Sequence, residues 1–211
     1  MYNYSEKHNV LFVHIPKNAG TSIIDSLDMH STKVKHYPLS VLQSYMDKET
    51  FDKSIKIAVI RNPYERMVSY YRYRQNKSQD PLNYPFHLWL RNGKIQYNML
   101  SYDCLPQIKW CTKEDSVDLP KDIDYILNYE KIDEQWKELC EIEKLNVKPL
   151  QKLNTSGQYD YVKYYKIAED AVLVNNIFKA DCQLFGYDLG EPNDFPLLKG
   201  HTEIDNFLRG K

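Results

Sequence analysis

Residues 10–27 read VLFVHIPKNAGTSIIDSL and contain three local patterns in direct succession. Residues 10–14 are mostly β-branched or apolar, which is typical of a short buried strand. Residues 17–20 form a loop that ends in glycine. The apolar side chains that follow recur at helical spacing: Ile23, Ile24 and Leu27. The stretch therefore predicts a strand, a loop and a helix.

A second unit of the same kind follows downstream. Residues 55–60, IKIAVI, predict another strand, and the helix after it is predicted to run to about Gln75. Asn62 is a candidate N-cap, Pro63 occupies the first helical position, and Glu65 completes a capping-box pattern. The chain thus repeats a strand that leads directly into a helix.

Weaker patterns predict the remaining elements: a strand at 123–127, amphipathic helices near 132–140 and 167–180, and a helical patch near 86–90. Strands that alternate with helices predict an α/β fold with a central parallel sheet flanked by helices. We expect one domain over residues 1–211, with an irregular, substrate-side segment at about 76–120.

The charge balance limits the classes of partner. The 211 residues include 28 basic and 29 acidic side chains, for a formal net charge of -1. This balance disfavours a nucleic-acid partner held by global positive charge, so any anion site must be local. Hydrophobic residues at 42% and charged residues at 27% exclude a disordered chain, a collagen and a coiled-coil rod.

The sequence predicts a cytoplasmic protein without a membrane span. No apolar run approaches the roughly 20 residues that a membrane helix needs, and residues 1–9 lack the pattern of a secretory signal. The cysteines show no C-x-x-C spacing, so no structural metal is expected: Cys104, Cys111, Cys140 and Cys182. Reduced, mostly buried thiols are expected, with a Cys104–Cys111 bridge as the alternative.

The loop at residues 17–20 is a candidate anion site. N–H groups of such a loop and of the first helical turn lack partners within the helix and attract anions. Lys17 adds a cation, and Thr21 and Ser22 add hydroxyl donors. The pattern differs from the nucleoside triphosphatase loop G-x-x-x-x-G-K-[ST], because no lysine directly precedes Thr21. Taken alone, such a loop is also common as a structural turn.

A second candidate anion site lies in the second unit. Arg61 ends the strand, and Ser69 follows eight positions later on the helix. Singly, Arg61 would be interpreted as a surface ion pair and Ser69 as a neutral helical residue. Loops at the carboxyl ends of strands in an open α/β sheet face one crevice, so the two units together suggest a nucleotide with two separated phosphates.

These segments resemble the sulfotransferases that use 3'-phosphoadenosine 5'-phosphosulfate (PAPS), particularly the carbohydrate sulfotransferase branch and its small bacterial relatives. Residues 12–23 are similar to the family's 5'-phosphosulfate loop, and residues 59–71, VIRNPYERMVSYY, to its 3'-phosphate motif. Weaker likeness extends over short segments elsewhere: Lys35-His36, 128–132, Leu153-Asn154 and Phe185-Gly186-Tyr187. Residues 76–120 match least, and we expect them to shape acceptor choice.

The resemblance implies a P-loop-like sulfotransferase fold and a set of site residues. PAPS would be a co-substrate, a saccharide or another hydroxyl-bearing molecule the acceptor, and no metal would be needed. Lys17 would neutralise the bridging oxygen as it leaves, while Arg61 and Ser69 would hold the 3'-phosphate. The loop would hold the 5'-phosphosulfate through Lys17, Asn18, Ala19, Gly20, Thr21 and Ser22.

A base that works near neutral pH suggests histidine. His36 lies between the two phosphate motifs and is the best placed of the six histidines. An exposed loop histidine is the alternative interpretation of His36, and Glu65 and His14 are rival bases. On the second helix, arginines and tyrosines are a candidate lining for an anionic acceptor groove, or else a solvated face: Arg66, Arg72, Arg74, Tyr70, Tyr71 and Tyr73.

Two other functions compete with this interpretation. A nucleotide-dependent kinase would normally require a lysine beside the Thr/Ser of the loop and an aspartate that organises magnesium, and neither is evident. A nucleotide-binding module without transfer activity would keep Arg61 and Ser69 and need no base. The presence of Lys17 argues mildly against such a module.

Overall fold

The structure is a computed structural model of the chain. It describes residues 3–29, 36–76, 84–91, 105–112, 123–151, 153, 159–190 and 195–210. Cys104, Lys35 and Asn154 therefore lie outside the described residues.

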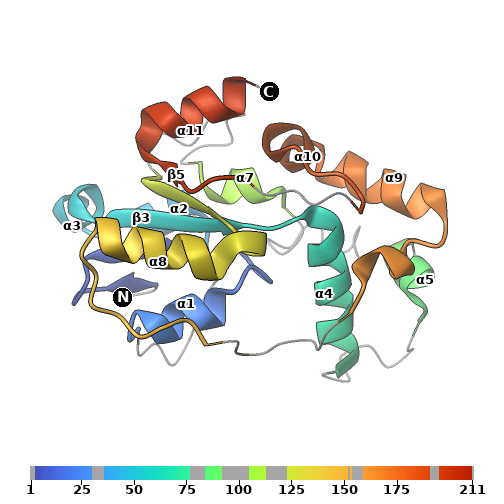
Figure 1. The fold of residues 1–211 in the computed structure, drawn as a ribbon, viewed down its shortest axis with the longest axis horizontal. Helices are drawn as coiled ribbons and strands as arrows, with labels where there is room; N and C mark the ends of the chain where they lie inside the picture. Colours follow the sequence, from blue (N-terminus) through green and yellow to red (C-terminus); the bar gives the residue numbers. More distant parts are fainter. Residues whose placement is uncertain are drawn as a thin grey trace.

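A five-stranded sheet in the order β1-β2-β3-β4-β5 lies at the centre of the fold (Figure 1). Its strands are β1 (Tyr4–Ser5), β2 (Val10–Val13), β3 (Ile55–Ile60), β4 (Tyr125–Asn128) and β5 (Leu198–Lys199). The pairs β2–β3 and β3–β4 are parallel, as predicted. The central pairs thus fit the predicted parallel sheet, whereas the two edge strands, β1 and β5, pair antiparallel to their neighbours and were not predicted. Strands of two residues are too short to show a period-2 pattern in the sequence.

The described helices connect and cover these strands. The α-helices are α1 (Gly20–Ser26), α2 (Leu39–Ser44), α3 (Lys48–Lys53), α4 (Pro63–Asn76), α5 (Phe86–Arg91), α7 (Gln107–Trp110), α8 (Ile132–Ile142), α9 (Ala168–Ile177), α10 (Lys179–Phe185) and α11 (Gly200–Arg209). Two short 3₁₀ helices are η2 (Tyr129–Lys131) and η3 (Tyr161–Tyr164). None of the helices in these ranges is long and apolar enough to cross a membrane.

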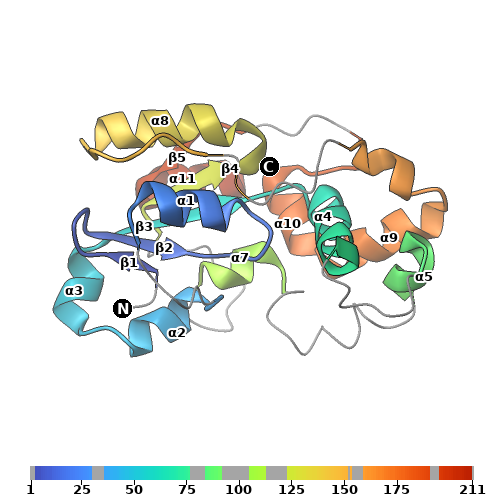
Figure 2. The same cartoon turned by 90° about the horizontal axis from the view of Figure 1, so that it is seen from below.

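Alternate residues of the strands point to opposite faces of the sheet and build two cores. On one face, Phe12 and Val59 pack with residues of α1 and α8. On the other face, Leu11 and Ala58 belong to a larger core that includes α2, α4 and α10. Figure 2 shows α1 and α8 on one side of the strands and α2, α3 and α7 on the other. Both views place α4, α5 and α9 beyond the end at which β3 leads into α4.

Two of the predicted helical regions differ from the structure. The helix predicted at 167–180 is two helices, α9 and α10, because Phe178 between them leaves helical geometry (φ -106°, ψ 28°) while its ring is fully buried. Within the segment 76–120, α5 confirms the predicted helical patch, whereas α7 was not predicted. A single helical turn gives too little periodicity to detect.

Candidate active site

The loops after β2 and β3 form the candidate site, because these two strands are parallel neighbours. Their register pairs Val13 with Ala58, so both chains leave the sheet at the same edge. The loop after β2 leads into α1, and the two residues after β3 lead into α4. This is the edge at which open α/β sheets bind their ligands.

The loop at residues 17–20 has the backbone geometry of an anion-binding nest. Lys17 (φ 70°) and Ala19 (φ 56°) are left-handed, while Asn18 and Gly20 are not. Alternation of this kind turns successive N–H groups toward one concave face, where an anion binds. Among the described residues, the N–H groups of Asn18, Ala19 and Gly20 have no backbone partner, whereas that of Ser22 donates to Ala19 O (3.0 Å).

Gly20 is required by its close approach to His14. A Cβ atom at this position would lie 1.8 Å from His14 Nε2. The His14 ring cannot easily move away, because it is buried, stacks on Phe12 and contacts His36. Glycine therefore allows the start of α1 to lie against the end of β2.

Lys17 is the cation of the loop. Its Nζ lies 4.2 Å from the centroid of the Tyr73 ring on α4. Burial, together with the positive charge of Arg61, lowers the pKa of Lys17 to about 8. The surroundings of Lys17 thus disfavour its charge, and an anion beside Nζ would raise its pKa again.

Arg61 joins the two loops. Its buried guanidinium donates from Nη1 to Lys17 O (2.8 Å) and from Nη2 to Glu65 Oε1 (2.8 Å). The Arg61 guanidinium also lies 3.9 Å from the centroid of the Tyr129 ring. Burial opposes its charge, but Glu65 and nearby tyrosines more than compensate and raise the pKa of Arg61. Its Nε is buried without a hydrogen-bond partner among the described residues.

Tyr159 lies next to both Arg61 and Ser69. Arg61 Nη2 lies 3.3 Å from the Tyr159 hydroxyl. The buried Ser69 is close enough to influence the pKa of that hydroxyl, which burial raises and Ser69 lowers. The structure thus places the two sequence-predicted residues of the second anion site beside one tyrosine hydroxyl. Sequence reasoning missed Tyr159, which lies 98 residues from Arg61 and belongs to no recognisable motif.

Only one of the two hydrogen bonds of the predicted capping box is present at the start of α4. The Asn62 side chain accepts a hydrogen bond from Tyr64 N (2.9 Å), as an N-cap should. The reciprocal contact would join Glu65 to Asn62 N. Instead, Asn62 N donates to Glu130 Oε1 (2.8 Å), and the Glu65 carboxylate binds Arg61. The buried arginine is the stronger partner for Glu65, because that hydrogen bond joins two charges.

His36 lies beside His14 near the start of α1. The two ring centroids are 4.2 Å apart, and His36 Nδ1 is 3.2 Å from the His14 carbonyl oxygen. Because a carbonyl oxygen only accepts hydrogen bonds, this contact requires the proton on Nδ1 and leaves Nε2 as the acceptor in the neutral ring. His14 is a poor proton carrier, because burial and the neighbouring His36 hold the pKa of His14 well below its usual range.

The proposed acceptor lining on α4 divides between core and surface. Arg66 is fully buried and donates from Nε to Pro16 O (3.0 Å), and Tyr70 is buried against Trp89. These two residues are structural, so both predicted alternatives, an acceptor groove and a solvated helix face, are wrong for them. Tyr73 is 38% exposed and lies under Lys17 Nζ. Arg72 is half-buried and donates to the Tyr164 hydroxyl. Helical periodicity in the sequence does not reveal whether an arginine on a helix is buried or exposed.

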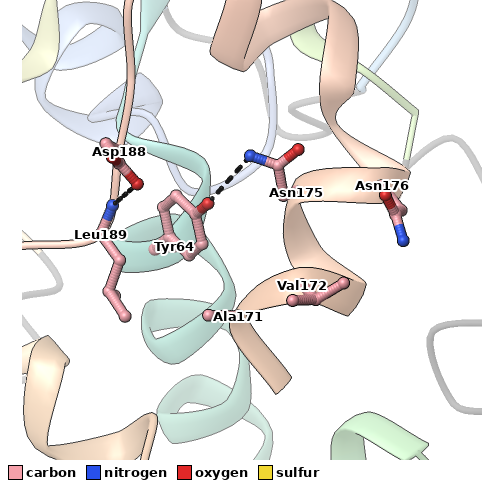
Figure 3. A pocket seen from close by; sticks show the side chains of 7 residues that line it. All are labelled: Tyr64, Ala171, Val172, Asn175, Asn176, Asp188 and Leu189. Atoms are coloured by element: carbon pink, nitrogen blue, oxygen red, sulfur yellow. Dashed lines mark hydrogen bonds between the residues drawn. The ribbon is translucent and has the colours of Figure 1, made fainter. Parts of the chain in front are cut away.

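An open pocket of ≈ 290 Å³ lies between α4 and α9 (Figure 3). Its lining consists of Tyr64, Ala171, Val172, Asn175, Asn176, Asp188 and Leu189. Figure 3 shows the Tyr64 hydroxyl directed at Asn175, which donates a 3.2 Å hydrogen bond to it. Residues 17–20, Arg61 and Ser69 do not line this pocket, but Asn62 of the second loop donates to Asp188 O (3.2 Å) in its lining.

The comparison with protein families identifies the class of enzyme. Residues 1–188 match the family model described as "Sulfotransferase family", and the chain belongs to this family. Membership implies a transferase that moves sulfuryl groups from a nucleotide donor to a hydroxyl acceptor. No curated protein and no solved structure matches the chain significantly. Among the described residues, no group of three or more His, Cys, Asp or Glu side chains could hold a metal ion.

Proposed function

We propose that this sulfotransferase transfers the sulfuryl group of PAPS to an acceptor hydroxyl on a carbohydrate. The observation that carries the proposal is the position of Arg61. Its side chain donates to the loop at Lys17 O and also reaches the Tyr159 hydroxyl beside Ser69. Two cationic sites therefore lie next to each other, as a nucleotide with anions on both its 5' and 3' oxygens requires.

The roles of the chain's residues follow from the chemistry of the transfer. Sulfuryl transfer requires positioned anions and neutralisation of the charge that develops on the leaving oxygen. Lys17 supplies a proton-bearing cation for that bridging oxygen, and the N–H groups of residues 18–20 hold the phosphosulfate. Arg61 and Ser69 hold the 3'-phosphate. No metal is part of this proposal, because these groups provide the positive charge.

His36 is the proposed base for the acceptor hydroxyl. The contact of Nδ1 with the His14 carbonyl places the proton of the neutral ring on Nδ1, so Nε2 is the nitrogen that carries the basic lone pair. Glu65 is a weaker candidate, since its carboxylate is paired with Arg61. His14 is buried against Gly20 and neutral.

The proposed function includes a cellular compartment and a domain organisation. We place it in the cytoplasm, which is supported by the described cysteines: Cys111, Cys140 and Cys182 are free thiols. We also treat residues 1–211 as one domain, with acceptor choice determined by the segment at 76–120.

The proposal predicts that adenosine 3',5'-bisphosphate binds more tightly than adenosine 5'-monophosphate. Hydrogen bonds from Arg61 to a charged phosphate are each worth roughly 1.5 to 3 kcal/mol, so the affinity ratio should be about 10 or more. Calorimetry with both nucleotides measures this ratio. Arg61→Ala should bring it close to one. Arg209→Ala, which removes an exposed arginine on α11, should leave it unchanged.

Equal affinities for the two nucleotides in the wild type would contradict the proposal. Tight, magnesium-dependent binding of adenosine triphosphate would instead support the kinase. Incubation with labelled PAPS and a panel of saccharides, phenols and peptides then identifies the acceptor class. Label on phenols or peptides alone would overturn the carbohydrate assignment and leave the donor assignment intact.

Binding of a 5'-phosphate nucleotide should take up a proton near pH 8.5. Lys17, with a pKa of about 8, is partly neutral at that pH, and a bound phosphate raises its pKa by favouring the charged form. Affinity should accordingly fall as the pH rises through 8. Calorimetry in buffers of different ionisation enthalpy measures the uptake. Lys17→Arg should abolish it, because a guanidinium stays protonated throughout this range. Uptake that persists in Lys17→Arg would assign the proton to another group.

A further inference from the structure

Gln107 on α7 is a buried side chain at the junction of the two anion-binding loops, although it lies far from both in the sequence. Its Oε1 accepts from Asn18 Nδ2 (2.6 Å) and from Arg61 N (3.0 Å). Its Nε2 donates to Arg61 O (2.8 Å). One primary amide thus contacts the loop after β2 and pairs with both backbone groups of Arg61, the residue that directly follows β3.

Asp181 on α10 holds this amide in place. Its Oδ2 accepts from Gln107 N (2.7 Å) and lies 3.4 Å from Gln107 Nε2, while Oδ1 accepts from Ile108 N (2.9 Å). Asp181 is fully buried, and burial raises its pKa to about 6 although these hydrogen bonds oppose the shift. At neutral pH it is therefore an anion that fixes the start of α7.

The Asn18 side chain serves the same arrangement from the loop side. It is fully buried and donates to Val59 O (2.6 Å) as well as to Gln107. The side chain of Asn18 therefore points into the protein, and the anion contact proposed for this residue falls to its backbone N–H. Both amide hydrogens and both acceptor positions of Gln107 are occupied, so its orientation is determined uniquely.

We infer that Gln107 is a positioning residue that fixes the 5'-phosphosulfate site and the 3'-phosphate site relative to each other, so that a change at one site affects the other. The inference rests on the proposed function and adds to it the residue that sets the relation between the two ends of the donor. Loss of the amide releases Asn18 and the Arg61 backbone together. Binding at both ends of the nucleotide then weakens, although Gln107 lies behind the loops and contacts neither phosphate.

Three nucleotides test this inference without any assay of transfer. The affinity of adenosine 3',5'-bisphosphate divided by that of adenosine 5'-monophosphate measures binding at the 3' end. The affinity of adenosine 3',5'-bisphosphate divided by that of adenosine 3'-monophosphate measures binding at the 5' end. We call these two quantities the 3' ratio and the 5' ratio. In Gln107→Leu we expect each ratio to fall by about fivefold, the change that loss of one ordinary hydrogen bond gives. Ser69→Ala should lower only the first ratio.

Gln135 on α8 provides a matched control. It is also buried, accepts from Asn128 N (2.7 Å) at the end of β4 and donates to Phe195 O (2.6 Å). Gln135→Leu should reduce the melting temperature much as Gln107→Leu does, because both expose buried backbone groups without partners. Its two affinity ratios should stay at the wild-type values, which separates positioning from a general loss of stability.

Each outcome is decisive. Unchanged ratios in Gln107→Leu, or equal losses in Gln135→Leu, would overturn the inference while the proposed donor stands. If both affinity ratios of the wild-type protein were near one, the proposed nucleotide donor would be wrong, and the inference about Gln107 with it. If Gln107→Leu does not fold, Asn18→Ala provides a second test, because it removes the hydrogen bond from Asn18 to Gln107 and keeps the Gln107 side chain. Because the same Gln107 oxygen accepts from Asn18 and from Arg61 N, that variant should lower the 5' ratio strongly and the 3' ratio to a smaller extent. A loss confined to the 5' ratio, or no loss in either ratio, would contradict the coupling.

Discussion

Lys17→Ala is expected to lower the rate of sulfuryl transfer on the order of 100- to 1000-fold, the usual loss when one electrostatic donor to a transition state is removed. The charge on the bridging oxygen is greatest as its bond to sulfur breaks, so the loss should fall on turnover. Initial rates with labelled PAPS measure the effect. Binding of the product nucleotide shows how much of the loss arises in the ground state.

The fold of Lys17→Ala should remain intact. The lowered pKa shows that the surroundings of Lys17 disfavour its charge, so its removal takes away an unfavourable contribution to the folded state. Lys163→Ala is the matched control, because this lysine is 81% exposed on η3 and pairs with Asp160 at 3.6 Å. Retention of more than half the activity in Lys17→Ala would remove Lys17 from the mechanism.

His36→Ala is expected to reduce turnover about 100-fold or more, with little change in the affinity for the nucleotide. A general base acts on the acceptor hydroxyl and typically contributes a factor of 10² to 10⁴. The rate should also lose its dependence on the ionisation of an imidazole. A profile of turnover against pH, measured beside nucleotide affinity, separates these effects.

His201→Ala serves as the control for His36→Ala, because His201 is exposed on α11. Turnover in His36→Ala equal to that of His201→Ala would reassign the base. Glu65 would then be tested with Glu65→Gln, which keeps a hydrogen bond to Arg61 and removes the basic carboxylate. His14 would follow, although its burial against Gly20 makes a purely catalytic effect of its substitution hard to isolate.

Local patterns predicted the parts of the site that are contiguous in sequence. The loop at 17–20 and the strand that leads into Arg61 are each specified within a dozen residues, and the family comparison confirms the relationship that they suggested. Their roles as site residues stay predictions. The histidine base, the single domain and the acceptor role of residues 76–120 also stay predictions.

The residues that sequence reasoning missed act over long separations. Gln107 lies 46 residues from Arg61 and 89 from Asn18, and Tyr159 lies 98 residues from Arg61. Periodicity reports which face of an element is apolar, and it carries no information about a contact between elements. One sequence feature could have indicated Gln107: it is a polar residue beside apolar neighbours in a short segment, Leu105 to Trp110. Such a residue, once buried, requires partners.

Under the proposed function, the ion pair between Arg61 and Glu65 bears on the release of the spent nucleotide. The Glu65 carboxylate already occupies one edge of the Arg61 guanidinium. If Arg61 binds a 3'-phosphate as proposed, departure of that phosphate does not leave a buried cation unpaired, because Glu65 provides a replacement anion four residues away on α4. We expect this exchange to lower both the net affinity and the barrier to dissociation. An enzyme that uses PAPS would benefit, because its product would keep the 3'-phosphate of its donor, and a site that bound this group without competition would stay occupied after each turnover.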